Sequence, residues 1–149
     1  MHIQQLHSAQ KAEALQLARR VFMEYVAPDY GAEGIRSFAD FLQNGTHHLA
    51  VFGAWEQDKL VGMIATRSEC KHIALFFVDG QYHRQGIGKK LFEAVLKHGT
   101  ANEITVHASP YAVRVYHRLG FTDTDTEQLT DGIRYTPMVY QVSNSKQSS

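Results

Sequence analysis

The stretch that decides the fold is IALFFVDGQYHRQGIGKKL, residues 73–91. Its first six residues, 73–78, are apolar at every position, which predicts a central strand buried on both faces. Asp79-Gly80 ends that strand, and apolar residues at helical spacing follow at Ile87, Leu91 and Val95. A strand that runs through a glycine-bearing loop into an amphipathic helix is a βα unit, and it indicates parallel pairing in the sheet.

The loop between this strand and this helix has the composition of an anion site. Glycines 86 and 88 let the backbone approach a ligand closely, and the free N–H groups of a first helical turn favour phosphate oxygens. Arg84, Lys89 and Lys90 add positive charge. We therefore expect a pyrophosphate here. The loop does not match the glycine motif of dinucleotide-binding proteins, because Leu91 stands where that motif needs a third small residue. It does not match the phosphate-binding loop of NTPases either, because no Ser or Thr follows Lys89.

Two helices and a hairpin are predicted before this unit. Ser8 can cap a helix over about residues 9–26, which Pro28 forbids from continuing. A stripe of apolar residues at 35, 38 and 42 predicts a second helix that ends at Asn44-Gly45. Residues 49–55 and 60–66 read as two strands joined by a short polar loop, and we expect them to be antiparallel.

A strand, a helix and a last strand are predicted after it. Residues 104–108 form the strand, and Ser109-Pro110 begins a helix that stops at Gly120. Residues 133–142 form the last strand, with Pro137 indicating an edge position or a bulge. The polar end, 143–149, is predicted to be a disordered tail, so the single domain spans 1–142. This order predicts an α+β fold with a mixed, mostly antiparallel sheet.

Composition excludes several classes of function. The 15 Lys and Arg balance 15 Asp and Glu, so no global field favours nucleic acid or an anionic membrane. The single cysteine, Cys70, excludes an internal disulfide and a Cys-rich zinc site. The nine histidines lack metal-ligand spacing, so no metal is predicted. With no apolar run long enough for a bilayer and no targeting segment, we expect a cytoplasmic protein.

Two motifs resemble those of a known family. Residues His83–Gly88 resemble motif A of the GNAT superfamily of acetyl-CoA-dependent N-acetyltransferases, Arg/Gln-x-x-Gly-x-Gly/Ala at the end of the fourth strand, with His83 at the Arg/Gln position. Residues 104–121 resemble motif B, a strand followed by Ala…Tyr…Gly-Phe, with His107 where many members carry an Asn that touches the cofactor. The order of the preceding helices and hairpin also matches, so the resemblance covers about residues 1–142.

The resemblance implies a fold and a set of site residues. It implies a twisted mixed sheet whose fourth and fifth strands splay apart at a bulge around coenzyme A, with helices on its flanks. Tyr116 falls on the family tyrosine that protonates the leaving thiolate as a general acid. The residue that deprotonates the amine stays open among Asp79, Glu33, Glu69 and His72, of which we take Asp79 and Glu33 as catalytic candidates. The residues implied to bind acetyl-CoA are Phe77, Val78, His83, Arg84, Gln85, Gly86, Ile87, Gly88, Lys89 and His107.

The predicted function is therefore acetyl transfer from acetyl-CoA to a primary amine, by direct attack in a ternary complex. Residues 21–35 carry three acidic and no basic side chains, and 121–133 carry four acidic ones. In the family these segments wall the acceptor site, so we expect a small cationic amine. The alternatives are a non-catalytic acyl-CoA-binding sensor module and an acetyltransferase that acts on a protein N-terminus or lysine. Many relatives dimerise, so a homodimer is possible.

Overall fold

The computed structural model describes residues 1–142, and the predicted disordered tail, 143–149, lies outside the described residues. The strands follow the order β1-β2-β3-β4-β5-β8-β6 in one sheet, and β7 pairs with another part of β8. Every neighbouring pair is antiparallel except β4 and β5, which are parallel. This confirms the predicted mixed sheet. The strands are β1 (His2–Gln5), β2 (Ala50–Glu56), β3 (Lys59–Arg67), β4 (His72–Val78), β5 (Glu103–Ala108), β6 (Thr122–Asp123), β7 (Gln128–Thr130) and β8 (Ile133–Gln141).

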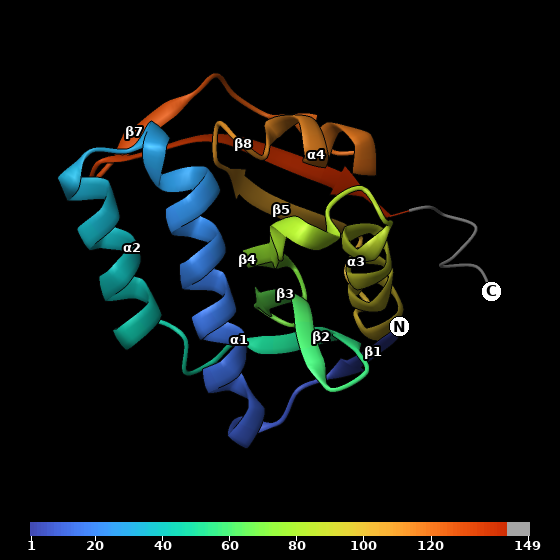
Figure 1. Cartoon of the computed structure of the whole chain (residues 1–149). Helices are drawn as coiled ribbons and strands as arrows, with labels where there is room; N and C mark the ends of the chain where they lie inside the picture. Colours follow the sequence, from blue (N-terminus) through green and yellow to red (C-terminus); the bar gives the residue numbers. More distant parts are fainter. Residues whose placement is uncertain (143–149) are drawn as a thin grey trace.

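Helices cover both faces of the sheet (Figure 1). Leu17 and Ala18 of α1 are buried with Met63 and Leu75 of the sheet, and the Leu91 side of α3 is buried in a separate core on the other face. The two cores pack on both faces of β3 and β4: residues 60–66 of β3 are buried, and in β4 Ile73 and Leu75 are buried on opposite faces while the other residues are half-buried. No helix within residues 1–142 is long and apolar enough to cross a membrane. The helices are α1 (Ser8–Val21), α2 (Ala32–Asn44), α3 (Ile87–His98) and α4 (Val113–Leu119).

Strand β4 is bulged and pairs with β5 over only two residues. A register shift opposite Ala65 and Thr66 of β3 leaves one extra residue in β4. The parallel pairing joins His72 to Thr105 and Ile73 to Val106, and then stops. Beyond that point β4 continues to Val78 without a partner on that side. The predicted divergence of these two strands is therefore confirmed.

Both helix starts that were assigned to serines are wrong. His7, not Ser8, caps α1: the helix includes Ser8, and the Gln10 side chain accepts a hydrogen bond from the His7 amide at 3.1 Å. After β5, the Ala112 amide bonds to the Ser109 carbonyl at 2.9 Å, which closes a single turn. Helix α4 therefore begins only at Val113.

The α-helical part of the first helix ends earlier than predicted. After Val21 the chain makes a π-helical turn, Phe22–Val26, and then a 3-10 turn, Ala27–Asp29. The Ala27 amide bonds to the Phe22 carbonyl, five residues back, and Pro28 has no amide with which to continue the helix. The prediction of a stop before Pro28 is thus confirmed, with a change of helix type before it.

Pro137 lies inside the sheet, so the prediction of an edge position or a bulge is wrong. It pairs opposite His107 in an unbroken register between β5 and β8. Its carbonyl accepts a hydrogen bond from the Thr124 amide at 2.9 Å, on the side away from β5. The proline nitrogen turns to that same side, between the segments that pair with β6 and β7, where no ladder hydrogen bond is required of it.

Candidate active site

The predicted anion loop is built at the end of β4. A short 3-10 turn, Gly80–Tyr82, follows the strand, and α3 begins after Gly86, whose φ is +80°. A side chain at Gly86 would meet nothing within 4 Å, whereas at Gly88 it would touch the Phe76 ring at 3.5 Å. The exposed segment Arg84–Gly86 thus leads to the free amides of the first turn of α3, with open space before them. This arrangement fits a phosphate group.

His83 bonds back to the strand that precedes it. Its Nε2 lies 2.7 Å from the Val78 carbonyl oxygen, so the ring N–H donates to the last residue of β4. Its ring also packs against Tyr25 at 5.0 Å between centroids. His83 therefore fixes the path of the loop relative to the strand, in the place where the family motif has Arg or Gln.

Asp79 joins the end of β4 to α1. Its carboxylate accepts a hydrogen bond from the Gln81 amide at 3.0 Å and pairs with the Arg20 guanidinium at 2.8 Å. Burial alone would raise the pKa of Asp79, but the bonds from Gln81 and Arg20 outweigh it, so the pKa lies below its ordinary value. A carboxylate held ionised in this way is a weak proton acceptor, and the geometry favours a positioning role.

Tyr116 lies in the core beneath the loop. Its ring contacts Phe76 of β4 at 5.9 Å and Phe121 at 5.2 Å. Burial raises its pKa above the ordinary tyrosine value, so the hydroxyl keeps its proton at neutral pH. Phe76 lies in the part of β4 that has no partner on the β5 side. Tyr116 thus combines a retained proton with a position beside the splayed strand.

Aromatic rings bridge the two sides of the splay. Tyr25, in the π-helical turn after α1, packs against Tyr111, which follows β5, at 5.3 Å between centroids. The Tyr25 hydroxyl lies so close to Gly80 that a side chain at position 80 would displace the Tyr25 ring. Tyr111 is 43% exposed, so this contact is at the surface. Nothing in the sequence near Tyr111 indicated a role, since its partner is 86 residues away in the chain.

A basic residue, Arg134, lies between the two acidic segments, 21–35 and 121–133, that are predicted to wall the acceptor site. Arg134 pairs with Glu127 at 3.3 Å and donates to the Asp29 carbonyl at 3.3 Å, so it lies between the walls. Glu33 is exposed in the first turn of α2, where Gly132 of the β7–β8 hairpin approaches it closely. Of the acidic groups predicted to attract a cation, Glu127 is ion-paired, whereas Glu33 has no ion pair with any residue of 1–142.

Two histidines meet where β4 and β5 stop pairing. The His72 ring lies 5.2 Å from the His107 ring at 79°, and His107 stacks on Tyr135 of β8 at 4.4 Å and 21°. Burial, with Arg67 and His107 in support, lowers the pKa of His72 to about 4. Burial and Arg67 also lower the pKa of His107. Both rings are therefore neutral at pH 7.

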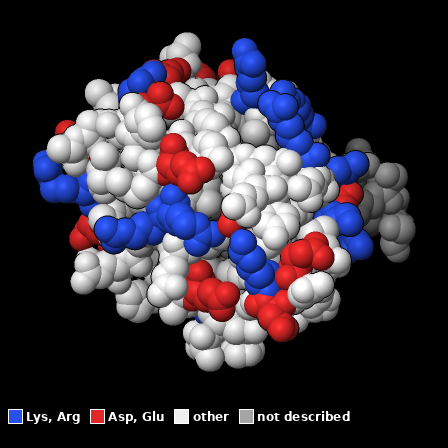
Figure 2. Space-filling view, viewed as in Figure 1, with Lys and Arg blue, Asp and Glu red and all other residues white. Residues whose placement is uncertain are grey.

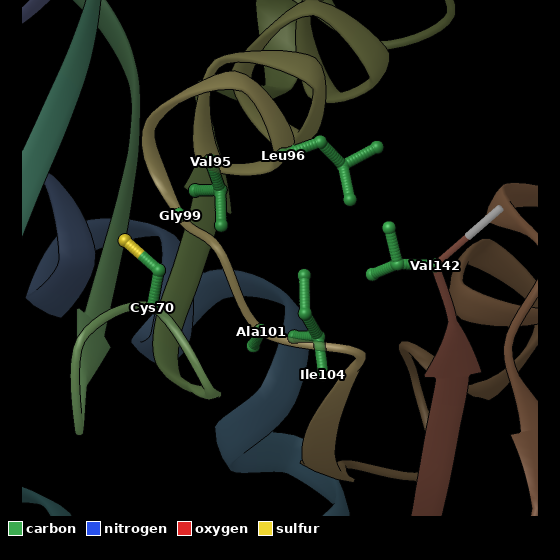
Figure 3. Close-up of a pocket in the computed structure, with 7 residues that line it drawn as sticks. All are labelled: Cys70, Val95, Leu96, Gly99, Ala101, Ile104 and Val142. Carbon is green, nitrogen blue, oxygen red and sulfur yellow. The ribbon is translucent and has the colours of Figure 1, made fainter. Parts of the chain in front are cut away.

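Neither of two cavities in the structure belongs to this loop. A cavity of about 10 Å³ lies among apolar side chains at the far end of α3, beside Cys70, Gly99 and Val142 (Figure 3). The length of α3, about 18 Å, separates it from Gly86. A groove of about 400 Å³ lies between the start of α1 and the end of α2, next to Lys11. The first has room for about one water molecule and the second lies at the opposite end of α1 from Arg20.

The charges of the chain balance, with 15 Lys and Arg against 15 Asp and Glu. Figure 2 shows basic and acidic side chains interspersed over the face that it presents. Local charge at the loop, rather than the charge of the whole molecule, therefore has to attract an anion.

Among residues 1–142, no group of three or more His, Cys, Asp or Glu side chains could hold a metal ion.

Comparisons with known proteins agree with this geometry. No curated protein sequence matches the chain. Among solved structures, a GCN5-related N-acetyltransferase from Rhodopseudomonas palustris is 18% identical with a TM-score of 0.72 and covers 95% of each chain. PaiA N-acetyltransferase from Thermoplasma acidophilum, solved with coenzyme A, is 18% identical with a TM-score of 0.69, over 95% of this chain and 98% of that one.

A third structure with the same fold has a protein as its named substrate. The ribosomal-protein-S18-alanine N-acetyltransferase from Escherichia coli is 23% identical with a TM-score of 0.62, over 95% of this chain and 94% of that one. The family profile of the acetyltransferase (GNAT) domain matches residues 26–142, which include the whole loop and both motifs. The chain therefore belongs to the GNAT acetyltransferase family and is an acyltransferase whose cosubstrate is acetyl-CoA.

Proposed function

We propose that this protein transfers the acetyl group of acetyl-CoA to the primary amine of a small cationic molecule, by direct attack in a ternary complex. The observation that carries the proposal is the combination, at one end of β4, of a splayed strand and an open loop before the amides of α3. The splayed strand offers backbone groups to an extended pantetheine arm, and the loop offers amides to a pyrophosphate.

The proposed cofactor residues divide into three groups. Phe77 and Val78 bind the pantetheine arm through their backbones, and an amide near Val78 polarises the thioester carbonyl. The Asp79 amide bonds to the Val61 carbonyl of β3 at 2.8 Å, so the backbone groups of Val78 face away from β3. His83 takes the Val78 carbonyl, which leaves the Val78 amide for the ligand. His83, Gln85 and Ile87 shape the loop and the start of α3, and Gly86 and Gly88 admit the phosphates. Arg84 and Lys89 supply positive charge.

Tyr116 is proposed as the general acid that protonates the leaving thiolate. The support is its position beside Phe76 and its retained proton. A general acid contributes about 10²–10⁴-fold to rate. Tyr116→Phe should therefore lower kcat by about 100-fold while the Kd for acetyl-CoA stays unchanged. An unchanged kcat would remove Tyr116 from this role.

Glu33 is proposed to attract the cationic acceptor. It is exposed, faces the β7–β8 hairpin and, unlike Glu127, has no ion pair within the part of the chain that the structure describes. Exchange for Gln removes the charge but keeps the shape, so Glu33→Gln should raise KM for a cationic amine and leave kcat unchanged. The matched control is Asp40→Asn, an exposed carboxylate further along α2 that bonds to Asn44.

Two measurements test the function itself. Calorimetric titration with acetyl-CoA and with free CoA compares the wild type with an Arg84→Glu/Lys89→Glu double variant, and a thiol-release assay then screens small amines. We expect binding that the double variant loses, and thiol release with one class of amine. No binding to the wild type would overturn the proposal.

The alternatives predict other outcomes. Binding without thiol release from any amine or peptide would favour the sensor module. Release only with peptides would favour a protein N-terminus or lysine as acceptor, the class of substrate named for the Escherichia coli structure. Two predictions accompany the proposal: a cytoplasmic location, from the sequence, and a homodimer, from the resemblance. Sedimentation of the purified chain checks the second.

A further inference from the structure

Three strands bring an unexplained set of side chains to the point where β4 and β5 separate. The last paired residues of these strands are Ile73 and Val106, and His107 follows Val106 directly. Tyr135 of β8 stacks on His107, and His72 of β4 meets it edge-on. Under the proposed function this is the inner end of the cofactor cleft, where the reactive end of an extended thioester would come to rest.

The histidines lie on the acceptor side of the sheet. Side chains alternate along a strand, and Ile73 and Val106 are buried in the core with α3. His72, Thr105 and His107 therefore project from the opposite face, on which α1 packs. At this end of the two strands, an amine on the α1 face meets the imidazole groups and not the side chains of Ile73 and Val106.

A hydrogen-bond chain holds the His72 ring. The Thr105 hydroxyl oxygen lies 2.7 Å from His72 Nδ1 and 3.4 Å from the Lys71 carbonyl oxygen. When the hydroxyl donates to that carbonyl, Nδ1 of the neutral ring is the donor to Thr105 and Nε2 carries the lone pair. His72 is half-buried and its Nδ1 is bonded to Thr105, so its ring is held in place against His107 and can orient it.

His107 has what a proton acceptor needs. It is exposed, so its ring can pass a proton to water, and Tyr135 holds the ring plane. The charged and titratable groups around it are Arg67 from β3, His72 from β4, Tyr135 from β8 and, on its own strand, Glu103, which bonds to Gln141. Arg67 disfavours a charged imidazole, and among the described residues no carboxylate pairs with His107 to hold a proton on it.

We propose that His107 is the residue that takes the proton from the acceptor amine, with Tyr135 and His72 as positioning residues. This rests on the proposed acetyl transfer. The ammonium gives one proton to His107, which passes it to water, and the neutral nitrogen then bonds to the acetyl carbon as the carbon–sulfur bond breaks. The sulfur takes a proton from Tyr116, and the proton that the nitrogen loses as the amide forms replaces it. The sum is acetyl-CoA and ammonium to amide, free CoA and one proton.

The experiment compares the wild type, His107→Gln and a control, His48→Gln, from the exposed loop between α2 and β2. Each is titrated with acetyl-CoA by calorimetry and assayed for thiol release with 1,4-diaminobutane and the other amines of the screen, from pH 5 to 9. In the wild type, kcat/KM should fall on the acid side with a midpoint below 6.5, because the protonated ring no longer accepts a proton. His107→Gln should lose about 100-fold in kcat and lose this acid limb, with an unchanged Kd for acetyl-CoA.

Three results would overturn the assignment. A wild-type rate and acid limb in His107→Gln would remove His107 from the reaction and leave the acetyl transfer intact. A weakened Kd for acetyl-CoA with an unchanged acid limb would make His107 a cofactor contact, as the family resemblance implies. A wild type that releases no thiol with any amine would overturn the proposed function itself, and this is distinguishable because the wild type alone reports it.

The positioning role of Tyr135 has its own readout. Tyr135→Phe keeps the stacked ring and should keep kcat. Tyr135→Ala removes the stack and should lower kcat by about 10-fold with KM unchanged, since a misplaced base costs rate and not binding. Equal kcat values for the two variants would show that the stack has no part in placing His107.

Discussion

The two glycines of the loop differ in what a methyl group would meet. Gly86 has a left-handed backbone, so Ala there is strained whatever the space, whereas Gly88 is helical and has ordinary contact distance to Phe76. Gly86→Ala should lower the free energy of unfolding by about 1 kcal/mol. Gly88→Ala should leave it unchanged or raise it by up to about 1 kcal/mol, because Ala favours a helix.

Gly88→Ala should also separate binding from stability. If coenzyme A lies against the first turn of α3, the methyl group of Gly88→Ala occupies space that ligand atoms need. The Kd for CoA should then rise at least 10-fold, although the variant is at least as stable as the wild type. Urea denaturation and calorimetric titration give the two quantities. An unchanged Kd would place the phosphates elsewhere.

The sequence indicated which positions of the loop and of β5 were unusual, but not what those side chains do. His83 and His107 stood out because they replace the residues of the two motifs. The bond of His83 to Val78 depends on the 3-10 turn between them, and the stack of His107 on Tyr135 depends on the register of β5 and β8. Neither turn geometry nor register can be read from residue types alone.

At the scale of elements, the end of β4 depends on α1. The Arg20–Asp79 pair joins them, with the Asp79 side chain 12% exposed and that of Arg20 55% exposed. A double-mutant cycle of Arg20→Met and Asp79→Asn should give a coupling energy of about 1 kcal/mol in urea denaturation. The same cycle on Arg134→Met and Glu127→Gln, where both side chains are about half exposed, should give less. Equal coupling in the two cycles would contradict the inference that Asp79 anchors α1.

Elements with strong periodicity were predicted and those with weak signals were not. In α2, α3 and β4 the spacing of the apolar residues indicates both the type of element and the face that it buries. All three lie where they were predicted. Strands β1 and β6 are short and lie at the two edges of the sheet, so they need a neighbour to define them. Strand β7 had a signal that was missed: Asp131-Gly132, with φ of 53° and 79°, makes the hairpin turn to β8.

For the whole molecule, acid should reduce stability in a way that one histidine controls. The pKa of His72 is about 4 in the folded protein and 6.5 in the unfolded chain, so between these values the unfolded chain binds a proton that the folded protein does not. His72 therefore does not reduce the free energy of unfolding above pH 6.5, and it reduces that free energy progressively as the pH falls from 6.5 towards 4. The lowered pKa of His107 acts in the same direction.

His72→Asn tests this, because an Asn amide can still donate to Thr105 but does not titrate. Between pH 7.5 and 5 the variant should lose about 1 kcal/mol less unfolding free energy than the wild type, allowing for the water that screens a half-buried ring. His48→Asn, which removes an exposed histidine, should follow the wild type. Urea denaturation at several pH values measures both. If His72→Asn and the wild type lost stability in parallel, acid would act through the net positive charge that the balanced molecule acquires, and not through the ring at the splay of β4 and β5.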